Sequence, residues 1–486
     1  TLLTMAGFAL GVTAMIALLS TGEAILQQAE DKSLLGGDLV LLPAGIDVEV
    51  LRVGGATGYD FTISNARFIQ RQLLSGPRLG EKIAAVSPQM KNKVLYLRHR
   101  GTVRPVLVNG ALPSQERIVN PTAPRIAAWR SNADDRAWMD PPPAVLYPTI
   151  DRFHLPNPLN PLAKTWAEWH YFKWHDDAQR AYGYLSFIIG GNLTTGRGRG
   201  VVMLRVSARG THSPWYRHTA QVRLSDFSTT RPDLRIGQNT VRFDGARYRL
   251  CVAFTDAATK TPVRAVLSLR PTPDLYYPPF VVRAGGGFES GYVVPALHAE
   301  VDGEIVIGNR RLVLRRAHGY HDHNWGYWAA VHWDWGTASD GNYAVLYGAI
   351  HHPQLERAGL ARNFLFLSQA RRGARRGGLL GMFQPEAIEF ERRKVLTLPR
   401  SKAVLHVPRT IRLRARADNG DTLHVVVDVQ DVLPTPNAVP ARPDLVFLQM
   451  RGNYRVSGRV ANRRVDFRAT GFAETFVNAK DESRTR

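Results

Sequence analysis

The chain has 486 residues, 44% hydrophobic and 21% charged, which is the composition of a folded globular protein and excludes a disordered one. Its formal net charge of +22 could serve nucleic acid or an anionic membrane surface. The basic residues are spread along the chain without a helix-turn-helix, zinc-finger or RNA-binding aromatic pattern, so we expect no nucleic-acid partner. The single cysteine, Cys251, excludes an intrachain disulfide, and its setting in RYRLCVAFTD predicts a small buried strand residue.

A transmembrane helix is predicted over residues 1–22. This run contains no charged residue and is long enough to cross a bilayer. A cleaved signal peptide is the alternative, but the apolar run is long for one, and no small-x-small cleavage site precedes the helix expected from Glu23 to Asp31. A buried helix of a soluble core is a weaker alternative. Because Thr1 is not a start methionine, we expect the chain to be part of a longer protein.

Residues 23–132 are predicted to form a small mixed α/β domain. Its elements are a strand from Asp38 to Leu42, a helix around Ile63 to Leu74, and strands in DVEVLRV, KVLYLRHR and VRPVLVNG. Together with the apolar start, the segments IAAVSPQMKNKVLYLR and VLVNGALPSQE resemble the FtsX-like permeases of ABC transporters and their MacB-like extracytoplasmic domain.

This first resemblance implies a place for the chain in the cell. It implies an inner (cytoplasmic) membrane location, with the bulk of the chain periplasmic, and an ABC transporter ATPase or permease as a partner. One feature departs from the family, because a permease needs further membrane helices near its C-terminus, and nothing after residue 20 is apolar enough to span a bilayer.

Residues 133–163 are rich in proline and lack periodicity, which predicts a linker or an extended strap. Beyond it, short segments such as GVVMLRVSA, YRLCVAFTD and TLHVVVDV alternate in polarity and are divided by Gly, Asp, Asn and Pro. Such a rhythm predicts a mainly β fold of antiparallel sandwiches or barrels. The length favours two barrels in tandem, over residues 164–328 and 329–486.

The segment from Ala317 to Trp335, AHGYHDHNWGYW followed by VHWDWG, combines histidines, carboxylates and tryptophans. A polar cluster walled by aromatic rings predicts a pocket. In a strand, His321 and His323 would share one face, and Asp322 and Asn324 the other. Either Asp322 or His323 could then donate a proton to an apolar substrate. The tryptophan rings could stabilise a carbocation; these are Trp325, Trp328, Trp333 and Trp335.

Two other interpretations of this segment remain. A structural one has Asp322 and Asn324 fix a sharp crossing between domains while the tryptophans fill the barrel. A metal-binding one uses the His-x-His pair, with His351 and His352 as further ligands. Because no carboxylate or cysteine stands at a confirming spacing, we assign no metal site and no cofactor.

A second cluster, TWAEWHYFKWHDD, begins the first barrel. Strand geometry would place Glu168, His170 and Phe172 on one face, opposite Trp169 and Tyr171. A glutamate among aromatic rings is costly to bury without a partner. We therefore expect Glu168 to contact either an arginine that closes the barrel mouth or a ligand, and the sequence favours neither.

These clusters carry a second resemblance. EWHYF resembles the E-W-W-Y-F opening of the carotenoid hydratase and AttH-like lipocalin family, and GYHDHNWG resembles its H-D-H-N-W-G signature. YRVSGRVANRRVDFRATGFAE, ending in Glu474, is similar to its terminal hairpin. The likeness covers about residues 160–480. It implies two lipocalin-like β-barrels side by side, and a cofactor-independent reaction on a hydrophobic, often isoprenoid, substrate after protonation of a double bond.

By position in that family, His323 and Trp325 match functional residues, and Tyr347 matches a downstream tyrosine. The family's expected acid, two residues after that tyrosine, is Ala349 here, and His170 replaces the second tryptophan of the opening motif. The catalytic candidates are therefore Asp322, His323, Trp325 and Tyr347. The candidates for ligand binding are Glu168, Trp169, His170, Tyr171, His321, Asn324, Trp328, Trp333, Trp335 and Glu474.

The sequence thus predicts a membrane-anchored, lipocalin-like protein that binds a hydrophobic, isoprenoid or lipid-like small molecule and is coupled to an ABC transporter. The alternative is a hydratase or cyclase that protonates an isoprenoid double bond. A purely structural transporter domain is a third hypothesis, which leaves the polar pocket unused.

Overall fold

The computed structural model describes the residues that follow. They are 63–75, 83–99, 102–112, 115, 118–119, 141–193, 197–328, 331–357, 363–371, 373, 377–391, 394–398, 404–417, 420–436 and 445–479. The chain divides into two compact units, one of residues 1–74 and 81–140, the other of residues 75–80 and 141–486. The membrane helix predicted over residues 1–22 lies outside the described residues. Within the described ranges, no helix is long and apolar enough to cross a membrane.

The described part of the first unit includes a helix and a hairpin. Helix α3 (Ile63–Ser75) coincides with the predicted helix. Strands β1 (Gln89–His99) and β2 (Thr102–Ala111) pair antiparallel, where two strands were predicted. The buried Gln70 side chain donates a hydrogen bond to the carbonyl oxygen of Val86, which ties the helix to the segment that precedes the hairpin. The strands expected in residues 38–53 lie outside the described residues.

The second unit begins inside the segment predicted as a linker. Helix α6 (Pro143–Ile150) starts with proline, which suits the first helical turn because its missing N–H would have no intrahelical partner there. Its buried Tyr147 ring packs edge-on against Phe243 and Tyr248 of the sheet that follows. The proline-rich segment is therefore docked on a sheet, and Asp151 follows directly at the end of the helix.

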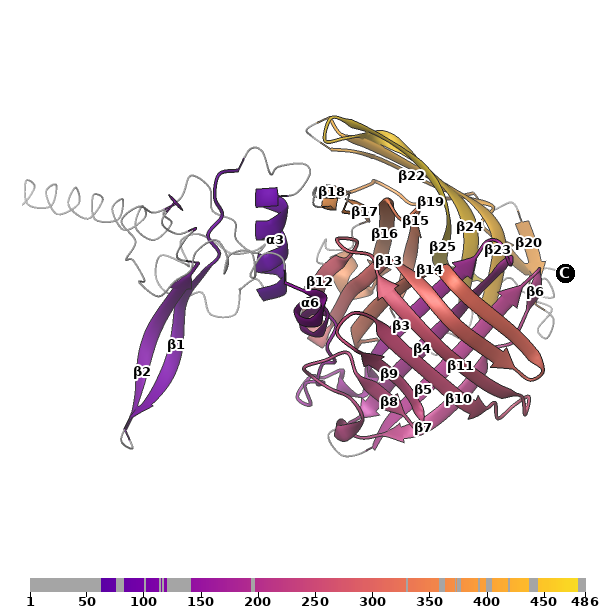
Figure 1. Cartoon of the computed structure of the whole chain (residues 1–486), viewed down its shortest axis with the longest axis horizontal. Coiled ribbons are helices and arrows are strands. Elements are labelled where there is room, and N and C mark those ends of the chain that lie inside the picture. The colour runs from indigo at the N-terminus through magenta and orange to yellow at the C-terminus, as the bar shows by residue number, and fades with distance from the viewer. Residues whose placement is uncertain are drawn as a thin grey trace, which may run out of the picture. The chain divides into compact units, whose positions relative to one another are not determined.

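Twelve antiparallel strands form the first sheet of this unit (Figure 1). They are β3 (Trp166–Asp176), β4 (Ala181–Asn192), β5 (Arg197–Ala208), β6 (Thr211–His212), β7 (Tyr216–Val222), β8 (Leu234–Ile236), β9 (Asn239–Phe243), β10 (Tyr248–Thr255), β11 (Pro262–Pro271), β12 (Tyr277–Arg283), β13 (Glu289–Ile307) and β14 (Arg310–Tyr327). The main path runs β6-β5-β4-β3-β14-β13-β11-β10-β9-β8. The sheet curls until β8, at one end, contacts β5 and β7 at the other.

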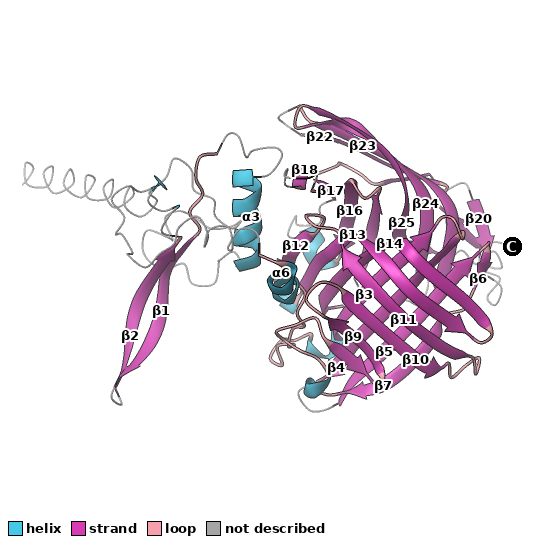
Figure 2. Ribbon diagram, viewed as in Figure 1, coloured by secondary structure: helices cyan, strands magenta, loops and turns pink. Residues whose placement is uncertain are grey.

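Nine strands form the second sheet, in the order β18-β17-β16-β15-β25-β24-β23-β22-β19 (Figures 1 and 2). They are β15 (His332–Ser339), β16 (Tyr343–His351), β17 (Phe364–Gln369), β18 (Gly378–Phe383), β19 (Glu389–Glu391), β22 (Thr410–Arg416), β23 (Thr422–Pro436), β24 (Leu445–Val460) and β25 (Arg463–Asn478). A separate hairpin pairs β20 (Lys394–Thr397) with β21 (Val404–Val407). The described unit is thus mainly β with half-barrel sheets, which confirms the predicted class at this level.

Strand alternation places one side chain differently from the prediction. In β10 the buried positions are Tyr248, Leu250 and Val252, whereas Cys251 is exposed. Because successive strand residues point to opposite faces, the core residues on either side direct Cys251 outward. The prediction of a buried cysteine was wrong, since the apolar neighbours rather than the thiol determine which face of β10 meets the core.

Candidate functional site

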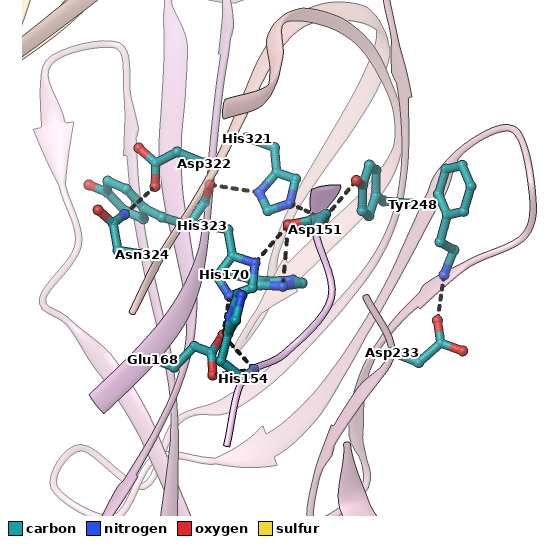
Figure 3. Close-up of polar contacts among 12 residues, drawn as sticks. Asp151, His154, Glu168, His170, Asp233, Tyr248, His321, Asp322, His323 and Asn324 are labelled. Carbon is teal, nitrogen blue, oxygen red and sulfur yellow. Dashed lines mark hydrogen bonds and ion pairs between the residues drawn. The ribbon is translucent and has the colours of Figure 1, made fainter. Parts of the chain in front are cut away.

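The two signature segments form neighbouring strands, and their side chains fall on two faces. Strand β14 pairs with β3, with His323 opposite His170 and Asp322 opposite Tyr171. His321 and His323 share one face and Asp322 and Asn324 the other, as predicted (Figure 3). One face lies in the core of the first sheet and the other meets the second sheet.

We define the inner cluster as Asp151, His154, Glu168, His170, His321 and His323. Asp151 lies at its centre (Figure 3). The Oδ1 atom of Asp151 lies 2.8 Å from His323 Nδ1, and Oδ2 lies 3.0 Å from His321 Nε2. The Tyr248 hydroxyl donates a 2.7 Å hydrogen bond to the same Oδ2. This carboxylate is therefore a shared acceptor in a fully buried setting.

Glu168 is the second carboxylate of the inner cluster. Its Oε1 atom lies 2.8 Å from His323 Nε2 and 2.7 Å from His154 Nδ1. The His154 backbone N–H also points at both carboxylate oxygens, 3.0 Å away. The protein partners of Glu168 are thus two histidines rather than the arginine that one alternative expected, and its contact with a ligand stays a prediction. His323 bridges the two carboxylates.

Burial and charge set the protonation of this cluster. Burial alone would lower the pKa of His323, but its hydrogen bonds to Asp151 and Glu168 outweigh burial and raise the pKa to about 9. Burial would likewise raise the pKa of Asp151, but the surrounding imidazoles hold it well below its usual value. Burial dominates at His170 and lowers its pKa well below the usual range.

Two triads of the inner cluster have the residue types and spacing of metal ligands. Asp151, His170 and His321 form one, and His154, Glu168 and His323 form the other. In each triad the candidate ligand atoms lie within 4.8 Å of one another. Histidine nitrogen and carboxylate oxygen are ligands that zinc and neighbouring transition metals accept.

We define the intersheet cluster as the polar and aromatic side chains between the two sheets. It consists of Tyr171, Lys173, Tyr292, Tyr320, Asp322 and Asn324 from the first sheet, and Trp335, Gln449 and Glu474 from the second. Asp322 accepts hydrogen bonds from the Tyr320 hydroxyl at 2.9 Å and from the Asn324 amide at 3.0 Å. Burial nevertheless raises the pKa of Asp322 to about 7.

Glu474 connects the two sheets through the same cluster. Its Oε1 atom accepts hydrogen bonds from the Tyr171 hydroxyl and the Lys173 ammonium, each at 3.0 Å. The ammonium also lies 3.6 Å from the centroid of the Trp335 ring. Burial lowers the pKa of Lys173, although Glu474 opposes this shift. A fully buried lysine is thus held by one carboxylate and a cage of aromatic rings.

Three half-buried tryptophans border the intersheet cluster. Trp169 lies 4.6 Å from Trp328 and 6.5 Å from Trp333, measured between ring centroids. The Trp333 indole N–H donates a 3.0 Å hydrogen bond to Glu474 Oε2. The aromatic group therefore extends from partly exposed rings to the buried Glu474 carboxylate.

Residues 1–156 match the family model of the MacB-like periplasmic core domain. The match covers about a third of the chain and includes Asp151 and His154. No curated protein matches the sequence.

Two solved structures are similar to the chain. One is a protein of Nitrosomonas europaea named as an AttH, at 16% identity and a TM-score of 0.41, covering 64% of this chain and 92% of its own. The other is kievitone hydratase from Nectria haematococca, at 13% identity and a TM-score of 0.40, covering 64% of this chain and 88% of its own. Likenesses this distant leave the function to be argued from the site itself.

The structure separates the four residues predicted to act together in catalysis. Asp322 lies in the intersheet cluster, whereas His323 and Trp325 lie on the opposite face, where the Trp325 ring stacks on His154 with centroids 4.0 Å apart. Tyr347 is fully buried in the hydrophobic core of the second sheet. In β16 it pairs with Gly336, so it faces away from the side that carries Trp335. The predicted quartet therefore does not share one site.

The residues predicted to bind a ligand divide in the same way. Glu168, His170 and His321 lie in the inner cluster. The others lie between the two sheets; these are Trp169, Tyr171, Asn324, Trp328, Trp333, Trp335 and Glu474. The further metal ligands considered, His351 and His352, belong to neither: His351 Nε2 lies 3.0 Å from Asp334. A cavity of about 580 Å³ lies elsewhere, beside Trp215, Arg217, His218 and Asp256, and none of the predicted site residues lines it.

Sequence reasoning missed Asp151, His154 and Lys173. The first two belong to the segment predicted as a linker, and an Asp-x-x-His spacing in a proline-rich stretch carries no signal of its own. Lys173 follows Tyr171 in the EWHYFKW segment, and its place on the Tyr171 face could have been found from strand alternation.

Proposed function

We propose that this chain binds an apolar small molecule, of isoprenoid or lipid-like type, between two lipocalin-like halves at the intersheet cluster. The observation that carries the proposal is the group of partly exposed rings of Trp169, Trp328 and Trp333, which leads to buried hydrogen-bonding groups at Asn324 and Glu474. Aromatic rings that remain partly accessible and lead to a few fixed polar groups are typical of ligand-binding sites, where the polar groups orient the guest.

The setting of this binding protein is part of the same proposal. The match of residues 1–156 to a MacB-like periplasmic core domain supports an extracytoplasmic position for the domain and an ABC transporter ATPase or permease as partner. The uncharged run of residues 1–22 supports attachment to the inner membrane. The chain would then hold an apolar molecule on its way to or from the transporter.

Native mass spectrometry of the full chain, extracted in detergent, tests this binding. We expect one apolar small molecule per wild-type chain. The Trp169→Ala variant should lose it, because Trp169 contributes its ring to the aromatic border. The matched control is Trp215→Ala, which removes another half-buried tryptophan, beside the separate cavity. A wild-type chain without a guest, or equal loss in both variants, would contradict the proposal.

A second candidate function, acid catalysis, is favoured by the position of Asp322. Its carboxyl group is buried on the face that carries the aromatic border, and burial favours the neutral acid. The proton would pass from the carboxyl group to one carbon of a double bond, water would add to the cation at the other carbon, and the proton lost by that water would restore the carboxyl group.

The Asp322→Asn variant separates catalysis from binding. We expect it to retain the bound molecule but to lose about 10²–10⁴-fold in the rate of oxygen-18 incorporation from labelled water into geraniol, used as an alkene probe. Unchanged incorporation in the variant, or none in the wild type above the uncatalysed rate, would leave binding as the function.

A further inference from the structure

Asp151, His170 and His321 converge from three separate segments of the chain. Asp151 follows helix α6, His170 lies on β3 and His321 on β14. All three side chains are completely buried. They come together because the segment predicted as a linker packs on the first sheet. Neither the binding nor the acid catalysis proposed above uses any of these three residues.

His170 is the unexplained member of this triad. Neither of its ring nitrogens makes a hydrogen bond of acceptable geometry, although both are buried. A buried polar group left without a partner destabilises the fold, and such groups are rare in native proteins. The His170 ring stacks on Phe153, with centroids 4.5 Å apart, so its orientation is fixed by packing. Its Nε2 atom lies 3.7 Å from Asp151 Oδ1, too far for a hydrogen bond.

The spacing of the three donor atoms suits a shared metal ion. Ligand bonds of the length zinc makes to nitrogen and oxygen place neighbouring donors of a tetrahedral site about 3.3 Å apart. The Asp151 carboxylate spans the two histidines, with Oδ2 lying 3.0 Å from His321 Nε2 and Oδ1 lying 3.7 Å from His170 Nε2, close to this value. All three donor atoms lie within 4.8 Å of one another.

The hydrogen bonds around the triad point to the same conclusion. His321 Nδ1 lies 3.2 Å from the Tyr171 carbonyl oxygen, which can only accept, so this nitrogen carries the proton. The other nitrogen, Nε2, lies 3.0 Å from Asp151 Oδ2, and either a proton or a metal ion can occupy the space between these two atoms. Hydrogen bonds of this kind, from the second nitrogen of a ligand histidine to a carbonyl, are the usual support of metal sites.

We propose that Asp151, His170 and His321 bind one divalent transition-metal ion of the zinc class, and that Tyr248 and His323 orient the Asp151 carboxylate toward it. The other triad differs because both of its histidines hydrogen-bond to Glu168, whereas neither ring nitrogen of His170 makes a hydrogen bond. The ion would join the three parts of the chain that carry its ligands, namely the segment after α6, β3 and β14.

The test uses the full chain, freed of metal with a chelator and titrated with Zn²⁺ alone by calorimetry. The wild-type chain should bind one Zn²⁺ and unfold at a higher temperature with the ion than without it. The His170→Phe variant should bind Zn²⁺ at least about 100-fold more weakly, since even residues that only support a ligand contribute about 10–100-fold. Without metal it should unfold no earlier than the wild type, because phenylalanine removes the unpaired nitrogens and preserves the ring.

The matched control is His175→Phe, at another buried histidine of β3 that lies outside both triads. Its Zn²⁺ affinity should equal that of the wild type. The proposal is overturned if the metal-free wild-type chain binds no Zn²⁺, in which case His321 is a cation that donates at both nitrogens. It is also overturned if His170→Phe binds the ion as tightly as the wild type does. Neither readout depends on activity, so a failed metal site leaves the intersheet proposal untouched.

Discussion

Asp322 and His323 are consecutive in β14, and their side chains lie on opposite faces of the first sheet. Asp322 accepts its hydrogen bonds from Tyr320 and Asn324 in the intersheet cluster. His323 instead bridges Asp151 and Glu168 in the inner cluster. One strand therefore supplies two sites whose side chains do not share a space, although the sequence presents them as one motif.

Substitutions at these two neighbours should separate the two sites. Asp322→Asn should lower the rate of oxygen-18 incorporation into geraniol, the alkene probe, and should leave the Zn²⁺ affinity equal to that of the wild type. His323→Gln should weaken Zn²⁺ binding about 10–100-fold, because it loses an orienting contact to Asp151, and should retain the apolar guest. Calorimetry with Zn²⁺ and native mass spectrometry measure the two effects. If either variant loses both the ion and the guest, the two faces are not independent.

Lys173 and Glu474 join the two sheets, and a double-mutant cycle should show strong coupling between them. Their side chains are 0% and 6% exposed, and breaking a buried ion pair leaves one uncompensated charge. We expect Lys173→Met to lower the free energy of unfolding by about 3–5 kcal/mol. The double variant Lys173→Met, Glu474→Gln should recover much of this loss, since neither charge then remains. Urea unfolding of all four chains measures the cycle, and additive losses would contradict the coupling.

Local alternation was the part of the site that the sequence predicted correctly. Because side chains alternate along a strand, Glu168 and His170 were predicted on one face of β3 and Trp169 and Tyr171 on the other. The same alternation gave the two faces of β14. No knowledge of the partner strand was needed, because the period is a property of the backbone. The overall β class followed from the same rhythm.

Long-range pairing was what the sequence could not supply. Asp151 meets His321 and His323 across 170 and 172 positions of sequence, and nothing in its own segment marks it as their partner. The position of Tyr347 could not be derived from the sequence for a related reason. The family resemblance matched Tyr347 to a functional tyrosine downstream of the HDHNWG motif. The face of β16 that meets the first sheet is decided by how the second sheet packs. That face carries Gly348 rather than Tyr347.

Acid should destabilise the fold through His175 and His298. Burial lowers the pKa of His175 to about 3 and that of His298 to about 4. Above pH 6.5 the rings are neutral in both folded and unfolded chains and contribute nothing. Between pH 6.5 and pH 4 the unfolded chain binds protons that the folded chain does not, so stability falls by up to about 1.4 kcal/mol per pH unit for each ring.

The groups that face these two histidines keep the effect specific. His318 lies beside both rings, 3.0 Å from His298 Nε2, and it adds to the lowering of the His298 pKa by burial, which Glu300 and Asp340 oppose. The His298→Gln variant should therefore unfold with a shallower dependence on pH between 6.5 and 4. Urea unfolding in the presence of a chelator measures this slope and removes any contribution from bound metal. Equal slopes in the two chains would assign the acid sensitivity to other groups.

The Tyr248 hydroxyl should tune the proposed metal site without taking part in it as a ligand. It donates a 2.7 Å hydrogen bond to Asp151 Oδ2, the oxygen that faces His321. Tyr248→Phe removes only this oxygen and keeps the ring that packs against Tyr147 and Phe243. We expect Zn²⁺ affinity to fall about 10–100-fold, the range for groups that hold a ligand in place.

The comparison for this variant is Tyr182→Phe. It removes another hydroxyl that donates to a carboxylate, at 2.6 Å from Asp431, but outside the triad. Each variant loses one tyrosine hydroxyl that donates to a carboxylate, so each should lose about 1–3 kcal/mol of unfolding free energy when metal is absent. Only Tyr248→Phe should lose additional stability when Zn²⁺ is present, because only its partner is a ligand. If the two variants respond identically to the ion, the Asp151 carboxylate does not bind it.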